Sequence, residues 1–332
     1  DERVVEAIPS IGFVHRGLES LVTKRDFKDY VYIAERICGI CSYIHSATYC
    51  EGIEMIMGIE IPARAEYLRA IWSEYSRLHS HLLWLGCFAD SMGFENLFMN
   101  SWRIREQVLD VFEATTGGRV IQGVSKVGGV RRDISPEQFV SMKQGLDTLI
   151  PELEELTTVF LEDQTVQSRT RRVGILSRDD AYTLGAAGPM LRGSGVAQDM
   201  RMLGYGAYGD LDFKPVVEPG GDCYARCKVR VRELFTSADL IRQAIDQIPG
   251  GEIEVQVKGN PDGEYYARAE QPRGEVVHYI KGAGKKNLVR HRVRTPTAAN
   301  IPALVTTLKG CEMADVPVIV LSIDPCIGCM ER

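Results

Sequence analysis

Apolar residues recur three or four positions apart over much of the chain before residue 250. This spacing keeps one face of a helix buried, and it predicts long helices at 42–58, 61–85, 97–115 and 136–169. Four helices of this length can form the core of a bundle. A further helix is expected at 222–248.

After residue 252 the period changes to two, and β-branched and aromatic residues alternate with polar ones. Alternation places successive side chains on opposite faces of a strand, and Gly, Asn and Pro residues between the segments indicate turns. We therefore expect a small sheet, followed by a helix that ends near Gly310. The predicted strands are 253–257, 264–269, 275–280, 288–293 and 316–321, with one more at 4–14.

These patterns predict an α+β fold in which a long central helix bundle is flanked by small β-sheets. Length alone would allow about two domains. We expect one domain over 1–332 with three sub-regions. These are N-terminal strands in 1–35, the helical bundle in 36–250, and the small sheet with a C-terminal metal-binding segment in 251–332.

Two glycine-rich stretches could suggest nucleotide binding. Residues 117–132 are also basic, but they lack the Gly-Lys-Ser/Thr ending of a phosphate loop and no strand is predicted before them. We interpret them as a structured loop that contacts a partner. Residues 185–209 are expected to allow close backbone packing. We predict no nucleic-acid partner.

The composition is that of an ordinary soluble enzyme, with 332 residues, 45% hydrophobic and 25% charged residues, and a formal net charge of −6. No apolar run approaches the ~18 residues that a membrane-spanning helix needs. Membrane association is therefore expected to depend on partners. Nine cysteines without a signal sequence indicate a reducing compartment.

Two Cys-x-x-Cys pairs lie near opposite ends of the chain. Cys38 and Cys41 form the first pair, and Cys326 and Cys329 form the second. Four thiolates are the ligand set of a tetrahedral zinc or iron site, or of a site for another soft metal. Zinc ribbons join their pairs by a loop of roughly 15–20 residues, whereas here almost the whole chain intervenes. The fold must therefore bring its two ends together.

The residues around both pairs resemble the two signatures of the large subunit of nickel-iron hydrogenases. The first is R-x-C-G-x-C-x-x-x-H, complete from Arg36 to His45, and the second is D-P-C-x-x-C-x-x-R/H, complete from Asp324 to Arg332. In that family a protease trims the C-terminus after the last signature residue. The resemblance implies a mature chain at this end, and the opening at residue 1 suggests that N-terminal residues precede it.

A third motif points to one branch of this family. Residues 15–19, His-Arg-Gly-Leu-Glu, are similar to the H-R-G-x-E of group 4, energy-converting hydrogenases and of their relative, the quinone-site subunit of complex I. Glu19 aligns with a carboxylate that binds a structural magnesium in other hydrogenases. The alternative for Glu19 is an ordinary surface carboxylate.

The resemblance implies a particular metal centre. Nickel would be bound by all four thiolates, with Cys38 and Cys326 terminal and with Cys41 and Cys329 bridging to an iron that carries carbon monoxide and cyanide. Heterolytic cleavage of dihydrogen also needs a nearby base. The candidates are the thiolate of Cys326 and the guanidinium of Arg273, and the latter stays protonated in almost any surroundings.

Five further residues are implied around this centre. Pro272 and Arg273 lie in a run similar to the family's A-P-R-G-E, which places an arginine over the metals. Asp324 would pair with that arginine or with a backbone donor. Thr297 would donate to an iron cyanide, or else cap the helix that follows. His45 would contact a cysteine sulfur, or else be a buried core histidine.

Cys223 and Cys227 share a helix face at positions i and i+4. A second metal site and inert packing are both compatible with this spacing, and packing is favoured because no other Cys or His lies nearby in sequence. An isolated Cys-x-x-Cys is also common in redox or structural zinc pairs.

The resemblance implies the catalytic subunit of an energy-converting hydrogenase of the Ech-like or membrane-bound type, at the cytoplasmic face of the cell membrane. Its partners would be a complex I-like small subunit with an iron-sulfur cluster, ion-translocating membrane subunits, and ferredoxin acting through the complex. Two alternatives remain, namely a non-catalytic complex I-like subunit at a quinone site and a zinc-stapled scaffold. Metal analysis separates them.

Overall fold

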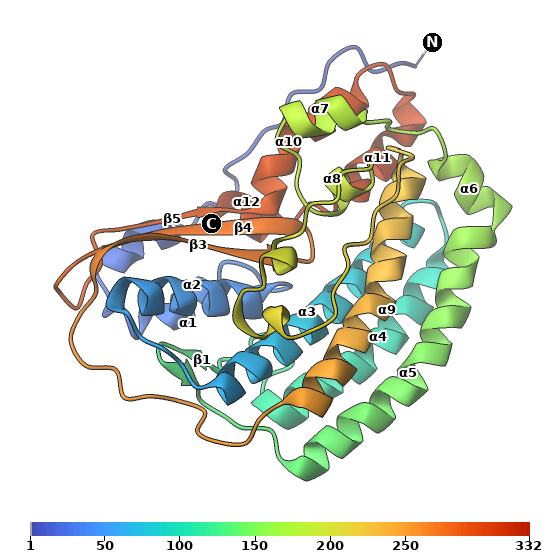
Figure 1. Ribbon diagram of the computed structural model, residues 1–332. Coiled ribbons are helices and arrows are strands. Elements are labelled where there is room, and N and C mark those ends of the chain that lie inside the picture. Colours follow the sequence, from blue (N-terminus) through green and yellow to red (C-terminus); the bar gives the residue numbers. More distant parts are fainter. Residues whose placement is uncertain (1) are drawn as a thin grey trace.

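The computed structural model describes residues 2–332 and has a helical body on one side and a three-stranded sheet on the other (Figure 1). Four long helices form the body: α3 (Ala63–Asp90), α4 (Glu95–Thr116), α5 (Pro136–Glu162) and α9 (Cys223–Gln247). Each packs against two of the others, α3 against α4 and α9, and α5 against the same two. The predicted α+β architecture is thereby confirmed.

The membership of this bundle differs from the prediction. Helix α2 (Ser42–Met57) was expected among the four core helices, but it packs mainly against the sheet and against α1 (Tyr30–Glu35). Helix α9 takes its place. Helix α2 has buried residues on most of its faces. It can therefore pack against the sheet and also contact α3, instead of lying inside the bundle.

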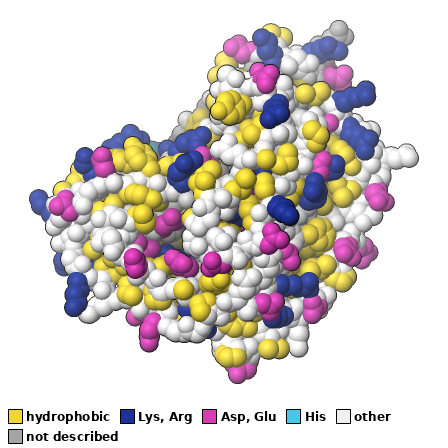
Figure 2. All heavy atoms as spheres, viewed as in Figure 1, with side chains coloured by type: hydrophobic (Ala, Val, Ile, Leu, Met, Phe, Trp, Pro, Cys, Tyr) yellow, Lys and Arg dark blue, Asp and Glu magenta, His cyan; other side chains and the backbone are white. Residues whose placement is uncertain are grey.

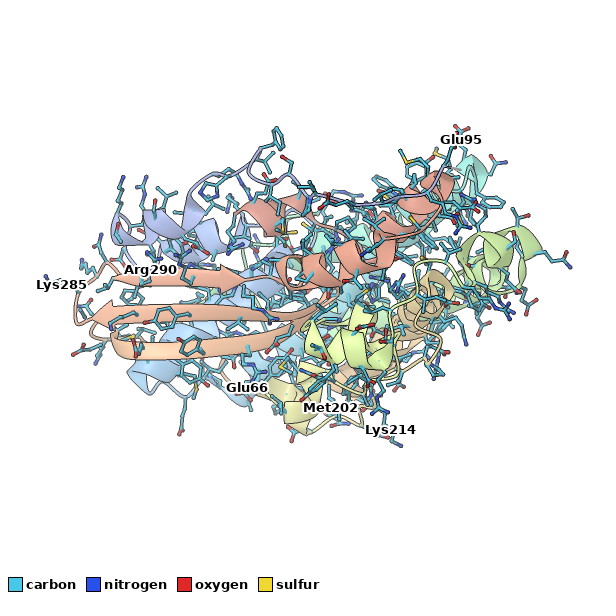
Figure 3. The ribbon with its side chains drawn as sticks, turned by 90° about the horizontal axis from the view of Figure 1, so that it is seen from above. Glu66, Glu95, Met202, Lys214, Lys285 and Arg290 are labelled. Carbon is cyan, nitrogen blue, oxygen red and sulfur yellow. The ribbon has the colours of Figure 1, made fainter. Side chains whose placement is uncertain are left out.

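The sheet is antiparallel and consists of β3 (Asp262–Gln271), β4 (Gly274–Ala283) and β5 (Arg290–Arg294) in that order. Gln271 pairs with Gly274 across a two-residue turn formed by Pro272 and Arg273. Seen from above, the strands lie side by side, and the end marked by Lys285 and Arg290 points away from the four-helix body (Figure 3). The Pro272–Arg273 turn lies at the opposite end, toward the helical body.

Three predicted strands are not strands in the structure. Residues 4–14 are extended and mostly exposed. Among backbone groups, the N–H of Val4 donates to Cys311, the carbonyl of Val4 accepts from Gly310, and the carbonyl of Gly12 accepts from His15. Residues 253–257 form a single bridge, between Glu254 and Gly129. Residues 4–14 have no strand to pair with, and residues 253–257 meet only the two-residue strand at Gly129–Val130. Pairing is what stabilises a strand.

Residues 316–321 form a helix, α11 (Val316–Ser322), although their β-branched residues favour a strand. The helix has Pro317 in its first turn, where the missing N–H costs nothing, and it packs against α3, α9 and α10 (Pro296–Leu308). Val318 and Ile319 are buried there. Tertiary packing outweighs the local preference.

The predicted helix 136–169 is divided at Asp163 into α5 and α6 (Gln164–Thr170). Asp163 has an extended conformation, and its carboxylate accepts hydrogen bonds from the backbone N–H groups of Thr165 and Val166. This is an N-cap, which starts a new helix with its own axis. The start of α5 was predicted correctly at Pro136, where Ser135 and Gln138 form a capping box.

The remaining elements are short and mostly connect the long ones. They are η1 (Leu18–Thr23), β1 (Ser125–Lys126), β2 (Gly129–Val130), α7 (Arg178–Thr183), α8 (Pro189–Arg192), η2 (Met200–Leu203), η3 (Gly206–Gly209), η4 (Met313–Asp315) and α12 (Ile327–Glu331).

A network of buried charges joins the helical body to the sheet. Arg192 on α8 pairs with Glu233 on α9 and with Glu270 on β3. The network contains three arginines and four carboxylates, so one negative charge is in excess. Burial, and next the nearby Asp199, raise the pKa of Glu270 to about 7. The other members are Glu74, Arg77 and Arg201.

Within residues 2–332, none of the helices combines the length and apolar character needed to cross a bilayer. The face seen in Figure 2 carries acidic and basic side chains interspersed with hydrophobic ones.

Candidate metal centre

The two Cys-x-x-Cys pairs meet where the ends of the chain come together. Cys41 directly precedes α2, and Cys326 is the N-cap of the C-terminal helix α12. Both pairs therefore lie at helix N-termini, where unpaired backbone N–H groups favour negative charge. The backbone N–H groups of Ile40 and Cys41 donate to the sulfur of Cys38, and that of Cys329 donates to the sulfur of Cys326.

The four sulfurs form one buried cluster. The Sγ atoms of Cys38 and Cys326 are 3.3 Å apart, and those of Cys41 and Cys329 are 3.5 Å apart. The sulfurs of Cys38, Cys41 and Cys329 all lie within 4.8 Å of one another. Since a thiolate binds a metal at about 2.3 Å, these separations suit ligands of a shared metal. All nine cysteines are free.

The surroundings lower the pKa of the Cys41 thiol but raise those of Cys326 and Cys329. Burial acts to raise the pKa of Cys41, but hydrogen bonds from the Cys329 and Cys38 thiols and the charge of Arg273 outweigh it, and the pKa falls to about 5. The pKa of Cys329 is raised, because it shares hydrogen bonds with Cys326, Cys38 and Cys41. Without a metal the four sulfurs cannot all be ionised, since like charges so close repel each other.

Arg273 extends from the β3–β4 turn toward the cluster. Its Nε donates to the backbone oxygen of Asp324 at 2.9 Å, its Nη2 to Asp324 Oδ1 at 2.9 Å, and its Nη1 to Ser80 Oγ at 3.2 Å. Burial acts to lower its pKa, but Asp324 and the cysteine thiolates raise it well above the usual value. The side chain is therefore a permanent cation.

Two glycines allow this turn to reach its position. A Cβ atom on Gly188 would lie 2.3 Å from the backbone oxygen of Arg273, and one on Gly274 would lie 2.5 Å from the backbone N of Gly188. Both residues also have positive φ, 63° and 127°. Any other residue at either position would push the turn, and Arg273 with it, away from the cluster. Close backbone packing was the predicted role of 185–209.

Asp324 pairs with Arg273 as predicted, and its backbone is unusual. Its φ is 58°, a left-handed conformation that aspartate tolerates better than most residues. One carboxylate oxygen, Oδ2, is buried and has no partner among residues 2–332. Pro272 lies beside Arg273 in the turn, and its ring fixes φ there.

Thr297 lies beside Cys326, whose backbone N–H donates to its hydroxyl at 3.2 Å. The alternative role predicted for it, helix capping, belongs to Thr295 instead, because the hydroxyl of Thr295 accepts from the backbone N–H of Ala298 at the start of α10. That prediction was wrong by two residues. Thr295 also donates to the backbone oxygen of Cys329 at 2.9 Å.

His45 lies on the face of α2 that faces the cluster. Its Nε2 is 3.4 Å from the sulfur of Cys329, so it contacts the pair at the other end of the chain. Its Nδ1 is 3.1 Å from Nε2 of a second buried histidine, His278. The ring is both a cysteine contact and a satisfied core histidine.

Glu19 lies at the C-terminal residue Arg332. Its carboxylate accepts from the Nε of Arg332 at 2.9 Å and from the backbone N–H of Val293 at 2.8 Å, and Arg292 approaches it at 3.3 Å. Burial acts to raise the pKa of Glu19, but these donors outweigh it and the pKa is lowered. The arginines provide the positive charge that a magnesium ion would, and magnesium binding stays a prediction.

Arg16 is a residue that the sequence analysis did not single out. Its guanidinium donates to the backbone oxygens of Arg36 and Ile37, before the first cysteine pair, and to that of Gly328, within the second. The three distances are 3.0, 2.9 and 3.1 Å. Arg16 therefore joins the two ends directly. Its place in the His-Arg-Gly-Leu-Glu motif was the signal available.

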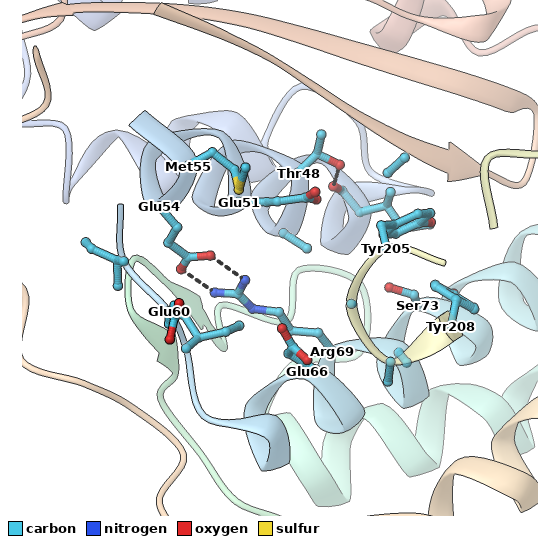
Figure 4. A pocket seen from close by; sticks show the side chains of 18 of the residues that line it. Thr48, Glu51, Glu54, Met55, Glu60, Glu66, Arg69, Ser73, Tyr205 and Tyr208 are labelled. Carbon is cyan, nitrogen blue, oxygen red and sulfur yellow. Dashed lines mark hydrogen bonds and ion pairs between the residues drawn. The ribbon is translucent and has the colours of Figure 1, made fainter. Parts of the chain in front are cut away.

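A cavity lies elsewhere in the molecule. It has a volume of about 580 Å³ and is lined by α2, the start of α3, β3 and residues 205–208. None of the four clustered cysteines, nor His45, is among the residues that line it. Figure 4 shows the Glu54–Arg69 ion pair across it. Burial raises the pKa of Glu51 to about 7.

Cys223 and Cys227 are buried in α9. Within residues 2–332, Cys38, Cys41 and Cys329 form the one group of three or more potential metal ligands, and neither Cys223 nor Cys227 belongs to it. Burial raises the pKa of Cys227 to about 12, which makes it a poor ligand. The packing interpretation holds for this pair.

Two family models match the chain. The model described as "Nickel-dependent hydrogenase" matches residues 16–87, and the model described as "Respiratory-chain NADH dehydrogenase, 49 Kd subunit" matches residues 91–260 and 256–332. The first includes the Cys38–Cys41 pair, and the second includes the Cys326–Cys329 pair.

Individual relatives match over the whole chain. The membrane-bound hydrogenase subunit alpha of Pyrococcus furiosus is 40% identical over 100% of this chain and 82% of its own length. The carbon monoxide-induced hydrogenase of Rhodospirillum rubrum is 39% identical over 100% of this chain and 92% of its own. A chain of the solved membrane-bound sulfane sulfur reductase, an archaeal respiratory membrane complex, superposes with a TM-score of 0.96 at 31% identity, covering 100% of this chain and 92% of that one.

Proposed function

The chain belongs to the family of group 4 hydrogenase large subunits, which is related to the 49-kDa subunit of complex I, and we propose that it is the catalytic subunit of an energy-converting nickel-iron hydrogenase. It would cleave dihydrogen and reduce protons reversibly. The observation that carries the proposal is the convergence of four free thiols from both ends of the chain beneath a cationic arginine.

The residues around the cluster fit a nickel-iron centre whose iron carries carbon monoxide and cyanide. Four soft ligands suit nickel and low-spin iron. Arg273 uses three of its five N–H groups, which leaves two without a partner among residues 2–332. The hydroxyl proton of Thr297 likewise has no acceptor among the described residues. Cyanide nitrogens accept hydrogen bonds, so these donors are suitable neighbours for them.

In this proposal all four cysteines would hold the metals, with Cys38 and Cys326 as ligands of nickel alone and Cys41 and Cys329 as ligands shared by nickel and iron. The sulfur contacts follow the same division, since Cys38 lies against Cys326 and Cys41 against Cys329. When bound, the metals supply the Lewis-acid and redox chemistry that dihydrogen cleavage requires.

The protein groups would orient and move the proton. The sulfur of Cys326 is the proposed base, since it is the least buried of the four cysteines, at 7% exposure, and lies at a helix N-terminus. Arg273 is too basic to release its proton, and its proposed role is to stabilise negative charge beside the sulfurs. Asp324 orients Arg273 through two hydrogen bonds.

Partners follow from the buried position of the centre. Electrons must leave through another subunit, and the proposed one is a complex I-like small subunit with an iron-sulfur cluster. Relatives of this chain are subunits of membrane-bound complexes, which supports peripheral attachment to ion-translocating membrane subunits at the cytoplasmic face, with ferredoxin acting through the complex. The 117–132 loop is the proposed contact for the small subunit.

Infrared spectroscopy of the chain purified with its small subunit, together with nickel and iron analysis and dihydrogen–deuterium exchange, tests the proposal. We expect carbon monoxide and cyanide bands, about one nickel per chain, and exchange activity. Cys326→Ser should abolish exchange, whereas Cys311→Ser, which removes a free cysteine outside the cluster, should leave it unchanged.

Two other results would contradict the proposal and support a different function. Zinc in the cluster without diatomic bands would identify a structural zinc site. No metal at all would indicate a non-catalytic complex I-like subunit, a function that the long match to the 49-kDa family model makes a real competitor.

A further inference from the structure

The cavity between α2, the start of α3, β3 and residues 205–208 has an excess of acidic side chains. Among the described residues that line it, four are glutamates, at positions 51, 54, 60 and 66, and one, Arg69, is a cation. Figure 4 shows these side chains around one space, on α2, on α3 and on the segment between the two helices. The volume, about 580 Å³, is typical of sites that bind small molecules.

Arg69 is committed to one of the four carboxylates. Its Nη1 and Nη2 atoms donate to the two oxygens of Glu54 at 2.8 and 2.7 Å, and Nη2 also donates to the backbone oxygens of Lys126 and Gly129. The backbone N–H of Gly128 donates to Glu54 as well, at 2.7 Å. Glu54 and Arg69 therefore form a bidentate ion pair in the cavity wall.

Glu51 and Glu66 have no such partner. Neither carboxylate makes a hydrogen bond or an ion pair with another residue in the part of the chain that the structure describes, 2–332. Burial raises the pKa of Glu51 to about 7, with Arg69 acting against it and with Glu54 and Glu66 adding to it. Burial also raises the pKa of Glu66. The two carboxylates thus repel each other across the cavity without a counter-charge.

The other walls of the cavity are aliphatic and aromatic. They include the side chains of Ile44, Met55 and Ile59 and the rings of Tyr205 and Tyr265. Aliphatic walls suit a hydrocarbon chain, and the faces of aromatic rings attract ammonium groups. The lining therefore combines negative charges with the apolar surface between them.

The spacing of the carboxylates decides between kinds of ligand. A divalent metal ion needs several oxygens around one point, but within residues 2–332 no three carboxylates bring oxygen atoms within 4.8 Å of one another. A neutral molecule would leave Glu51 and Glu66 buried without compensation. A flexible molecule with two ammonium groups on an alkyl chain provides both the charges and the apolar contact.

We propose that this cavity binds a linear alkyl diamine or polyamine, with one ammonium group paired with Glu51, another paired with Glu66, and the alkyl chain against the aliphatic wall. None of the four clustered cysteines lines the cavity. The site is therefore distinct from the metal centre, and the inference does not depend on the proposed function.

Isothermal titration calorimetry of the full chain with putrescine and spermidine tests the proposal. We expect one bound molecule per chain. n-Butylamine, which has a single ammonium group, should bind at least about tenfold more weakly than putrescine, because it forms one charged hydrogen-bonded pair fewer. Magnesium should not compete with putrescine.

Glu51→Gln and Glu66→Gln should each weaken putrescine binding by at least about tenfold. Both substitutions remove a charge that burial disfavours, so the variants should fold and should melt no lower than the parent. Glu155→Gln is the matched control, because it changes the net charge equally but lies at an exposed position of α5, outside the cavity. Its affinity for putrescine should equal that of the parent.

The pH dependence provides a second readout. Since the pKa of Glu51 is about 7, its carboxyl is partly protonated at neutral pH, and an adjacent ammonium group favours the ionised form. The groups that face it are Glu54 on α2, Glu60 before α3, Glu66 and Arg69 on α3, and the tyrosines of β3 and residues 205–208. Affinity for putrescine should therefore rise between about pH 6 and about pH 8 in the parent, and less so in Glu51→Gln.

Four results would overturn the proposal. They are no binding at millimolar putrescine, equal affinity for butylamine and putrescine, unchanged putrescine binding in both cavity variants, and displacement of putrescine by magnesium. Each result concerns binding alone. Absence of carbon monoxide bands would refute the proposed function and would leave the outcome of these titrations unaffected.

Discussion

The side chain of Arg273 depends on contacts from three separate segments. The β3–β4 turn carries it, Asp324 accepts two of its hydrogen bonds and Ser80 on α3 accepts a third. Its planar fork matches this set of acceptors, whereas a lysine ammonium would present the same charge as a point on a flexible stem.

Arg273→Lys therefore tests geometry at constant charge. We expect dihydrogen oxidation to fall about 10²-fold, the usual cost of losing one preorganised donor in an active site, with nickel content unchanged. The measurement is dye reduction under dihydrogen with parallel metal analysis.

Arg268→Lys is the control, because Arg268 lies on β3, before the turn that carries Arg273, and makes a half-exposed ion pair with Glu275. Its turnover should equal that of the parent. If Arg273→Lys also kept near-parental turnover, a positive charge at this position would be enough for catalysis. The planar shape of the guanidinium would then have no catalytic role.

At the scale of elements, buried ion pairs connect helices and strands that are far apart in sequence. Arg192 on α8 contacts both Glu233 on α9 and Glu270 on β3, and all three side chains are at most 2% exposed. His81 on α3 also contacts Glu233, at 2.8 Å. This network lies directly behind the turn that carries Arg273.

Arg192→Met should strongly destabilise the chain. The substitution keeps an extended side chain but leaves Glu233 and Glu270 buried without their cation. Removing one partner of a buried ion pair lowers the free energy of unfolding by about 3–5 kcal/mol. Urea unfolding followed by circular dichroism gives the free energy of unfolding.

The comparison variant is Arg242→Met, which removes an exposed ion pair between α9 and Asp147 on α5. Exposed pairs contribute roughly 0–1 kcal/mol, so this change should be small. If the free energy of unfolding fell by the same small amount in both variants, the buried network would be no more stabilising than the surface pair.

The same scale shows where local sequence signals fail. Residues 316–321 have a strand-like composition and form α11, and residues 4–14 have one too and pair with no strand. A strand needs a neighbour for its hydrogen bonds, whereas a helix satisfies its own. The segments with strong helical spacing were accordingly predicted better, from 42–58 to 222–248, except for the cap at Asp163.

At the scale of the whole molecule, the metal centre closes almost the entire chain into one loop. Arg16 reinforces this closure through the backbone oxygens of Ile37 and Gly328, and a Cβ on Gly328 would lie 2.9 Å from that same oxygen of Ile37. Loop-closure entropy opposes such a contact, and the hydrogen bonds of Arg16 help to offset it.

Arg16→Gln should weaken metal retention. The glutamine cannot reach both segments, and loss of an outer contact around a metal site typically lowers affinity 10–100-fold. Nickel remaining after dialysis against a chelator measures the effect, and trypsin should release the C-terminal segment faster than in the parent.

Arg25→Gln provides the reference, because Arg25 is an exposed arginine a few residues later in the chain. It should retain metal like the parent. Equal retention in Arg16→Gln would show that the sulfurs and metal alone keep the ends together.

The sequence by itself determined the four cysteines, the flanking Arg273 and Asp324, the fold class and most helices. These follow from residue types at fixed spacing, which local chemistry and periodicity express directly. Only the tertiary structure decided that α9 replaces α2 in the bundle, that 316–321 is helical, that Thr295 rather than Thr297 caps α10, and that Arg16 and His278 lie at the centre. Except for the cap at Thr295, these depend on contacts between residues far apart in the sequence, and no local pattern encodes which partners the fold brings together.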